Sequence, residues 1–144
     1  MTYGIDTDFL VAVEILDHPF HRQADALLQS LLGSGHDFAL APQTLAEFIH
    51  IVTDGKRMPK PLTMSAAIAR AEHWWQAREV TRVFPDDQAV TSFLTWLANY
   101  QIGRKRLLDT LLAASYAQAG IKCLITNNER DFKVFGYFEI VPFQ

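Results

Sequence analysis

The stretch Tyr3-Gly4-Ile5-Asp6 sets the interpretation of this chain, because a short apolar run ends there in a carboxylate. Three other acidic residues lie in a similar setting beside apolar segments: Glu47, Asp109 and Asp131. Charged side chains are rare beside buried segments, and they usually have a reason for being there. If the apolar runs are neighbouring parallel strands, all four carboxylates collect at the edge of the sheet where the strands end.

Short apolar runs alternate with helical patterns along the rest of the chain. We expect strands over about 2–6, 37–41, 80–84, 122–126 and 138–142. Apolar residues at helical spacing predict helices over about 19–32, 43–54, 63–78, 86–100 and 104–118. Strands separated by helices favour an α/β fold built from parallel β-α units with right-handed crossovers. A length of 144 residues fits one domain.

Composition and charge restrict the kinds of protein that this chain can be. The net charge of −3 and the pI near 5.9 give no overall attraction to nucleic acid, although local basic patches can still act. The single cysteine, Cys123, excludes an internal disulfide, and without a C-x-x-C pair a thiolate zinc site is not expected. No basic leader followed by an apolar stretch is visible, and no run approaches about 20 apolar residues. We therefore expect a cytoplasmic protein with no membrane partner.

Each acidic residue also has a purely structural interpretation. Asp6 could be a helix N-cap, and Thr44-Leu45-Ala46-Glu47 has the pattern of a capping box. However, Pro42 favours a helix that starts at Ala41, which would spoil the register of that box. Asp109 could complement a helix dipole, and Asp131 could cap a short helical turn that starts just after it.

One common cause can explain all four positions at once. Carboxylates that gather in one place repel one another, so they need a cation to stay ionised together. Hard oxygen ligands suit Mg²⁺ or Mn²⁺ better than zinc. A bound cation lowers the pKa of a ligand water and offsets charge on phosphorus. The four acids therefore indicate a metal-dependent enzyme that hydrolyses phosphodiesters with an activated water.

Four segments of the sequence resemble, in the correct order, the motifs of the PIN-domain nucleases, and most closely those of the VapC-like toxins of bacterial toxin–antitoxin pairs. The first is Ile5-Asp6-Thr7-Asp8-Phe9-Leu10-Val11, and the second is Leu45-Ala46-Glu47-Phe48. The third is Leu108-Asp109-Thr110-Leu111-Leu112-Ala113-Ala114, and the last is Ile125-Thr126-Asn127-Asn128-Glu129-Arg130-Asp131-Phe132. The resemblance covers nearly the whole chain, and the set of four motifs is more specific than any one of them.

The resemblance implies a three-layer α/β/α sandwich with a five-stranded parallel sheet, over a single PIN-like domain of residues 1–144. It implies an endoribonuclease toxin that depends on Mg²⁺ or Mn²⁺, with an RNA substrate, a cognate antitoxin and a homodimeric state. The catalytic and metal-binding residues it implies are the four acids already named, Asp6, Glu47, Asp109 and Asp131. Thr126 and Asn128 match positions that order the site by hydrogen bonds.

The chain departs from the family pattern at Asp8, where Asn or Ser is more usual. An extra carboxylate could strengthen metal binding, or it could point away and cap the following helix, and we favour the second interpretation. Asp131 occupies the most variable of the four acidic positions, and the neighbouring Glu129 could replace it.

Two further features could contact partners. The cluster Arg104-Lys105-Arg106 directly precedes Asp109 and could hold RNA phosphates, as could Lys56-Arg57 with Lys60, although short charge runs are often only solvated surface. Adjacent Trp74 and Trp75 point about 100° apart on a helix, so one is expected in the core and the other outside. The helical segment at about 63–78 is therefore a candidate partner surface, unless both rings share one core.

Two rival functions remain. Asp6-Thr7-Asp8 has the Asp-x-Asp pattern of phosphohydrolases that form an aspartyl-phosphate, but no convincing downstream Lys or Asp pair follows. The chain could also be a catalytically silent PIN-like domain that binds RNA or a protein. The presence of all four acids favours the enzyme over that alternative.

Overall fold

The five strands that the sequence predicts form one parallel sheet in the structure, a computed structural model that describes residues 1–144. The strand order is β3-β2-β1-β4-β5, and every neighbouring pair is parallel. The strands are β1 (Thr2–Ile5), β2 (Asp37–Leu40), β3 (Val80–Arg82), β4 (Cys123–Ile125) and β5 (Glu139–Val141). Because β1 is central, its carboxyl end lies in the middle of the sheet edge, which is where Asp6 follows it.

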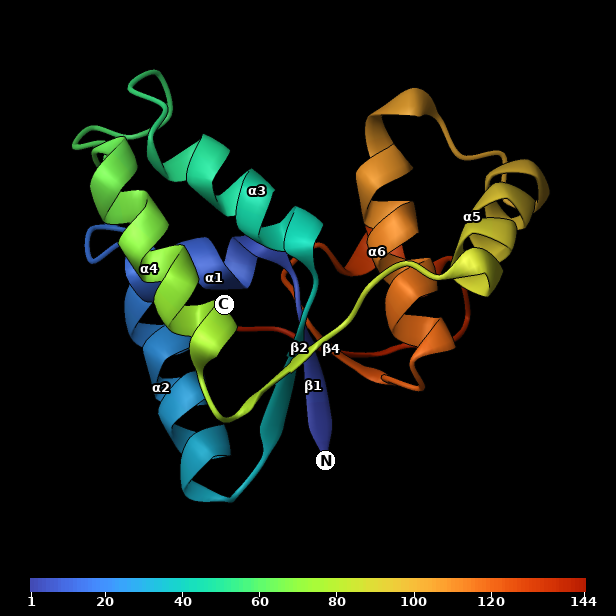
Figure 1. The fold of residues 1–144 in the computed structure, drawn as a ribbon, viewed down its shortest axis with the longest axis horizontal. Coiled ribbons are helices and arrows are strands. Elements are labelled where there is room, and N and C mark those ends of the chain that lie inside the picture. The colour runs from blue at the N-terminus through green and yellow to red at the C-terminus, as the bar shows by residue number, and fades with distance from the viewer.

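Seven α-helices and one short 3₁₀ turn connect the strands. They are α1 (Thr7–Glu14), α2 (His21–Gly33), α3 (Pro42–Val52), α4 (Met64–Gln76), α5 (Asp87–Asn99), η1 (Arg104–Arg106), α6 (Leu107–Gln118) and α7 (Glu129–Lys133). Helices α1 to α4 cover one face of the sheet, and α5 and α6 cover the other (Figure 1). The three-layer α/β/α arrangement is thus confirmed, with one apolar core on each side of the sheet. No helix combines the length and apolar character that a membrane span requires.

The helix pattern departs from the sequence prediction at α1 and at the start of α6. Residues 9–13 of α1 are all buried, so this helix shows no polar face and none of the periodicity that reveals an amphipathic helix. The helix predicted to begin at Arg104 begins as the 3₁₀ turn η1, and α6 proper starts at Leu107. Asp109 therefore lies in the first turn of α6, where its charge also complements the helix dipole.

A buried tyrosine joins the second helical layer to the centre of the sheet. The Tyr116 hydroxyl on α6 donates a hydrogen bond shared between the carbonyl oxygens of Ile5, at 2.7 Å, and Ala39, at 3.0 Å. The ring packs directly on β1, because a Cβ added at Gly4 would lie 2.9 Å from Tyr116 Cδ2. Only glycine allows this close approach, which fixes α6 against the ends of β1 and β2.

Candidate functional site

Asp6 sits at the carboxyl end of β1 and begins α1 as its N-cap. Its Oδ1 accepts a hydrogen bond from the Thr7 backbone N–H at 2.8 Å, and its Oδ2 accepts one from the Thr126 hydroxyl at 2.7 Å. The residue is only 3% exposed. Burial, followed by the charges of Asp8 and Glu47, raises the pKa of Asp6 to about 7 despite these two hydrogen bonds. The N-cap interpretation is therefore confirmed, and the same side chain also belongs to a group of interacting carboxylates.

Glu47 lies on α3, and its capping-box interpretation is wrong. Helix α3 begins at Pro42 with Ala41 as its N-cap, so Thr44 is inside the helix and cannot cap it. The proline sets this register, as expected from its preference for the first helical position. Glu47 instead lines a cavity of about 10 Å³ together with Asp6, at the carboxyl end of β1, and Asp109, on α6.

Asp109 is half-buried on α6 and closes this cavity from the opposite layer of the fold. Burial is the largest cause that raises the pKa of Asp109 to about 7, and the charges of Asp6, Glu47 and Asp131 add to it. Figure 1 shows α3 and α6 on opposite sides of the sheet edge that carries Asp6. The structure thus brings three of the four sequence-predicted acids around one small cavity.

Asp131 lies near this group, but its carboxylate already has a cationic partner. Its Oδ1 is 3.4 Å from Arg106 Nε, and its backbone carbonyl accepts a hydrogen bond of 2.7 Å from Arg106 Nη2. Asn128 is the residue that precedes α7, so the interpretation of Asp131 as a helix cap is wrong. Glu129, considered as its substitute, is exposed and pairs with Lys133 one turn later. Arg106 was expected to contact RNA, and the structure places its guanidinium on Asp131 instead.

Asp8 corrects our interpretation of the first motif. It does not cap the following helix, because Asp6 does so, and it does not point away from the other acids. Its Oδ2 accepts hydrogen bonds from the Asn127 backbone N–H at 2.8 Å and from the Thr126 hydroxyl at 3.2 Å. Its Oδ1 is buried and has no partner. Burial first, with a contribution from the charge of Asp109, raises the pKa of Asp8 to about 6.

The turn after β4 holds these carboxylates in place. Thr126 is fully buried, and its hydroxyl contacts both Asp6 and Asp8 while accepting a hydrogen bond from the Asn128 backbone N–H at 2.9 Å. The Asn128 side chain makes no capping bond and is exposed, so this residue contributes through its backbone alone. Sequence reasoning missed Asn127, whose backbone N–H binds Asp8 and whose side-chain Oδ1 accepts from the Phe143 N–H at 2.8 Å.

The carboxylate group suits a divalent cation in kind but is not closed around one. Its donors are hard carboxylate oxygens, which Mg²⁺ and Mn²⁺ prefer, and one of these oxygens is buried without a partner. No group of three or more His, Cys, Asp or Glu side chains is close enough together to hold a metal ion as it stands. Binding would therefore require these side chains to rotate toward the ion. The positive charge of the ion would then offset the repulsion among the carboxylates.

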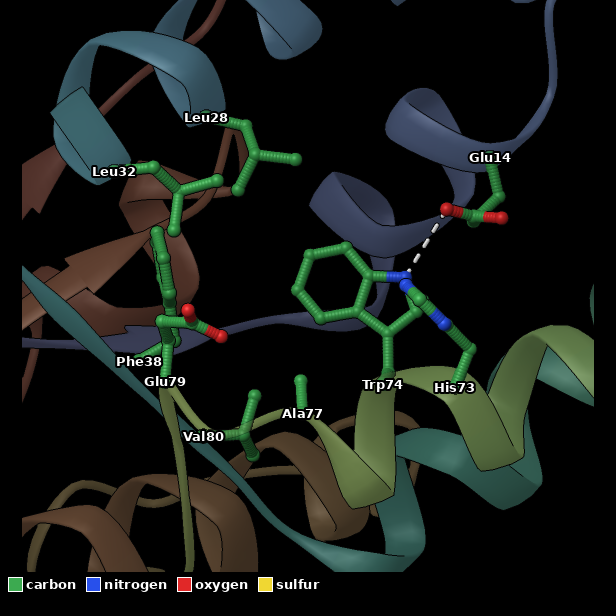
Figure 2. Close-up of a pocket in the computed structure, with 9 residues that line it drawn as sticks. All are labelled: Glu14, Leu28, Leu32, Phe38, His73, Trp74, Ala77, Glu79 and Val80. Atoms are coloured by element: carbon green, nitrogen blue, oxygen red, sulfur yellow. Dashed lines mark hydrogen bonds between the residues drawn. The ribbon is translucent and has the colours of Figure 1, made fainter.

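A larger and mostly apolar cavity lies away from the acids, between α2, α4 and the β2–β3 side of the sheet. It has a volume of about 170 Å³, and Figure 2 shows Leu28, Leu32, Phe38 and Trp74 on its walls. The Trp74 indole donates to Glu14 Oε2 at 3.1 Å, and Glu14 Oε1 also binds Arg70 at 3.0 Å.

The paired tryptophans differ in burial, but both pack on the same side of the sheet. Trp74 is buried in the core, whereas Trp75 is half-buried and stacks under the Arg82 guanidinium at 4.8 Å. The Trp75 ring also meets Phe84 edge to face. Trp74 belongs to the core that α1 to α4 form with the sheet, and Trp75 packs against that same core, so the expected separation of the two rings is only partial.

No protein-family model matches this chain, and no curated protein matches its sequence. Several solved structures share its fold over the full length. VapC20 of Mycobacterium tuberculosis, described as a toxin that cleaves the sarcin–ricin loop, superposes with a TM-score of 0.72 at 18% identity, over 96% of this chain and 98% of that one. VapBC2 of Rickettsia felis bound to promoter DNA superposes with a TM-score of 0.69 at 18% identity, over 100% of both chains.

VapBC of Salmonella typhimurium bound to DNA gives a TM-score of 0.66 at 19% identity, over 100% of this chain and 99% of that one. At such low identity the similarity lies in the course of the backbone, and it spans every layer of the sandwich. The parallel sheet of five strands and its two helical layers are thus those of known toxin structures. The chain therefore has the PIN-domain fold of the VapC-like toxins.

Proposed function

We propose that this chain is an endoribonuclease that depends on Mg²⁺ or Mn²⁺ and acts as the toxin of a toxin–antitoxin pair. The observation that carries the proposal is the meeting of Asp6, Glu47 and Asp109 around one cavity, although they lie on three elements far apart in sequence. Raised pKa values at Asp6 and Asp109 support it, because perturbed carboxylates gather at functional sites. The fold shared with a toxin described as cleaving the sarcin–ricin loop agrees with RNA as substrate.

The residues of the site divide the chemical work among themselves. Asp6, Glu47 and Asp109 would hold the cation, which supplies charge for the phosphate and a more acidic water when bound. Thr126 keeps the Asp6 carboxylate in position through its 2.7 Å hydrogen bond. A carboxylate of the group that is not engaged by the cation can accept the proton that the attacking water loses.

Removal of divalent cations tests the reaction directly. Purified protein incubated with total bacterial RNA and Mg²⁺ or Mn²⁺ should generate discrete new 5′ ends, which sequencing of those ends would map. Chelation with EDTA should stop the cleavage, because the carboxylates alone have no positive charge to place on the phosphate. Excess Mg²⁺ added back should restore it. Cleavage at the same positions and rate in EDTA would contradict the proposed metal dependence.

The RNA-contacting surface is proposed to include Arg104 and Lys105. Both are exposed in η1, two turns or less from Asp109, and neither forms a salt bridge. Their place beside the acids lets them bind phosphates that flank the cut site, which would offset the overall negative charge of the chain.

Neutralising these two residues should weaken RNA binding in a salt-dependent way. In an Asp109→Asn background that leaves RNA uncut, Arg104→Gln with Lys105→Gln should reduce the slope of log K against log salt by about 1.4 for two lost phosphate contacts on single-stranded RNA. Fluorescence anisotropy over a salt series measures that slope. The matched control is Arg22→Gln with Lys122→Gln, an arginine and a lysine that are exposed, form no salt bridge and lie outside η1. An equal reduction of the slope in both double variants would show a general charge effect and would contradict the assignment of Arg104 and Lys105 to the RNA-contacting surface.

A cognate antitoxin is the protein partner that we propose. A solved structure from Klebsiella pneumoniae with the same fold is a toxin–antitoxin complex, with a TM-score of 0.61 at 16% identity. On this chain, the apolar cavity beside α4 (Figure 2) supports the 63–78 segment as the binding surface for such a partner. The exposed Met64 and Ile68 of that helix support it as well. Exposed apolar residues on α5 and at the start of α6, Val90, Leu94, Leu107 and Leu108, support a separate surface for a homodimer.

A further inference from the structure

We propose that Asp8, and not Asp131, is the fourth carboxylate of the cation site in this chain. The inference rests on the metal dependence proposed above, and it replaces one member of the acidic set implied by the sequence motifs. It makes the ligand set Asp6, Asp8, Glu47 and Asp109, and it leaves Asp131 in its ion pair with Arg106. Two independent groups of contacts support it, one around each of the two residues.

The first group of contacts leaves one oxygen of Asp8 open. The Asn127 N–H and the Thr126 hydroxyl both bind Oδ2, so these contacts fix the side chain with Oδ1 unoccupied. That Oδ1 atom is buried and finds no donor within the protein. A buried charged oxygen without a partner is costly, so its presence in the fold calls for a ligand that is not part of the chain.

The cavity itself supplies a second unpartnered group. The Thr44 hydroxyl is 1% exposed and lines the cavity shared by Asp6, Glu47 and Asp109; it lies beside the Tyr116 hydroxyl but makes no hydrogen bond of good geometry. A cavity of about 10 Å³ is close to the least space that holds one water molecule or an ion of that size. Polar walls around so small a space fit one cation whose remaining water ligands lie outside the cavity.

The second group of contacts removes Asp131 from the set. Of the five carboxylates, only Asp131 forms a salt bridge, and Arg106 also holds its backbone carbonyl. A cation would have to compete with a guanidinium that the chain keeps in place. The side chains must rotate inward to ligate an ion, and this double contact restrains Asp131 from doing so. Asp6, Asp8, Glu47 and Asp109 form no salt bridge, although the charge of Arg106 also acts on Asp109 and lowers its pKa.

Calorimetric titration of metal-free protein with Mn²⁺ separates the two candidates. Asp8→Asn should raise the Kd for Mn²⁺ by at least about tenfold, the scale expected for a group that contributes to a metal site. Asp131→Asn is the matched control with the same change of charge, and it should leave the Kd nearly unchanged. An equal or larger loss in Asp131→Asn, or wild-type affinity in Asp8→Asn, would overturn the inference.

Thermal unfolding of the metal-free protein tells a ligand from a merely structural residue. Asparagine at position 8 keeps an oxygen that can accept from the Asn127 N–H, and it removes a negative charge beside Asp6. The midpoint of Asp8→Asn at pH 8 without metal should therefore rise above that of the wild type. A fall would show that the carboxylate serves the fold alone and would overturn the inference.

Failure of this inference can be told from failure of the proposed function. If Asp109→Asn loses Mn²⁺ binding while Asp8→Asn keeps it, only the assignment of Asp8 is wrong. If the wild type itself binds no Mn²⁺, the proposed metal dependence and this inference are both wrong.

Discussion

Replacing Asp109 by asparagine should lower the rate of RNA cleavage by at least about a hundredfold while the protein stays folded. Several kcal/mol of transition-state stabilisation are expected from a correctly held cation, and each 1.4 kcal/mol is a factor of about ten. Asp109 lies where the two helical layers meet the sheet edge, and no hydrogen bond contributes to its pKa, so the change removes charge without removing a structural contact.

The experiment compares wild type and variant both in cells and with purified protein. Induction of the wild-type chain without its partner should arrest growth and create new RNA 5′ ends, whereas Asp109→Asn should do neither. Asp37→Asn is the matched control, because Asp37 is exposed at the start of β2, at the opposite end of the strands. Circular dichroism would verify that all three proteins fold. Undiminished cleavage by Asp109→Asn would rule out the nuclease site described above.

Metal-free protein should become less stable as pH rises from about 4 to about 7. A carboxyl group whose pKa is higher in the folded state holds more protons there than in the unfolded chain, so raising the pH through this range favours unfolding. Asp6 is the best case, since it is almost fully buried and its pKa is raised from 3.8 to about 7. A shift of that size corresponds to about 4 kcal/mol for one group, with Asp8 and Asp109 acting in the same direction.

Urea unfolding at pH 5, 6, 7 and 8 in the presence of EDTA measures this dependence. His18 contributes a weaker pH dependence of opposite sign. Burial lowers the pKa of its imidazole, so protonation at acidic pH favours the unfolded chain. Mg²⁺ or Mn²⁺ should flatten the curve, because a cation stabilises the ionised carboxylates. The Asp109→Asn variant without metal should have a shallower slope than the wild type. Stability that is constant or increases between pH 5 and 7 would show that the acids do not interact as the structure indicates.

Much of the architecture follows from short-range patterns in the sequence. The strands are visible as apolar runs, and the connections between parallel strands place Asp6 and the turn after β4 at one edge. Pro42 alone was enough to choose between two registers for α3. By contrast, α1 is buried on so many sides that its sequence carries no helical periodicity.

The finer allocation of roles within the site could not be predicted. Asp8 is oriented by the Asn127 N–H, which is 119 residues away, and no local pattern encodes that contact. Arg106 belongs to a run of three basic residues, and only the folded chain shows that one of them turns inward to Asp131 while its two neighbours stay in solvent. Contacts of this kind depend on where two distant loops meet, which is a property of the assembled layers.

Gly4 and Tyr116 have to be considered as one unit when this chain is redesigned. A methyl group at position 4 would press on the aromatic ring at 2.9 Å, and the ring cannot retreat without giving up the carbonyls of Ile5 and Ala39. A bulkier residue at position 4 thus requires a smaller one at 116, and with it a different way to seat α6. Helix α6 carries Asp109, and β1 leads into Asp6. The packing of Tyr116 on Gly4 therefore sets the distance between these two acids, although neither Gly4 nor Tyr116 contacts them.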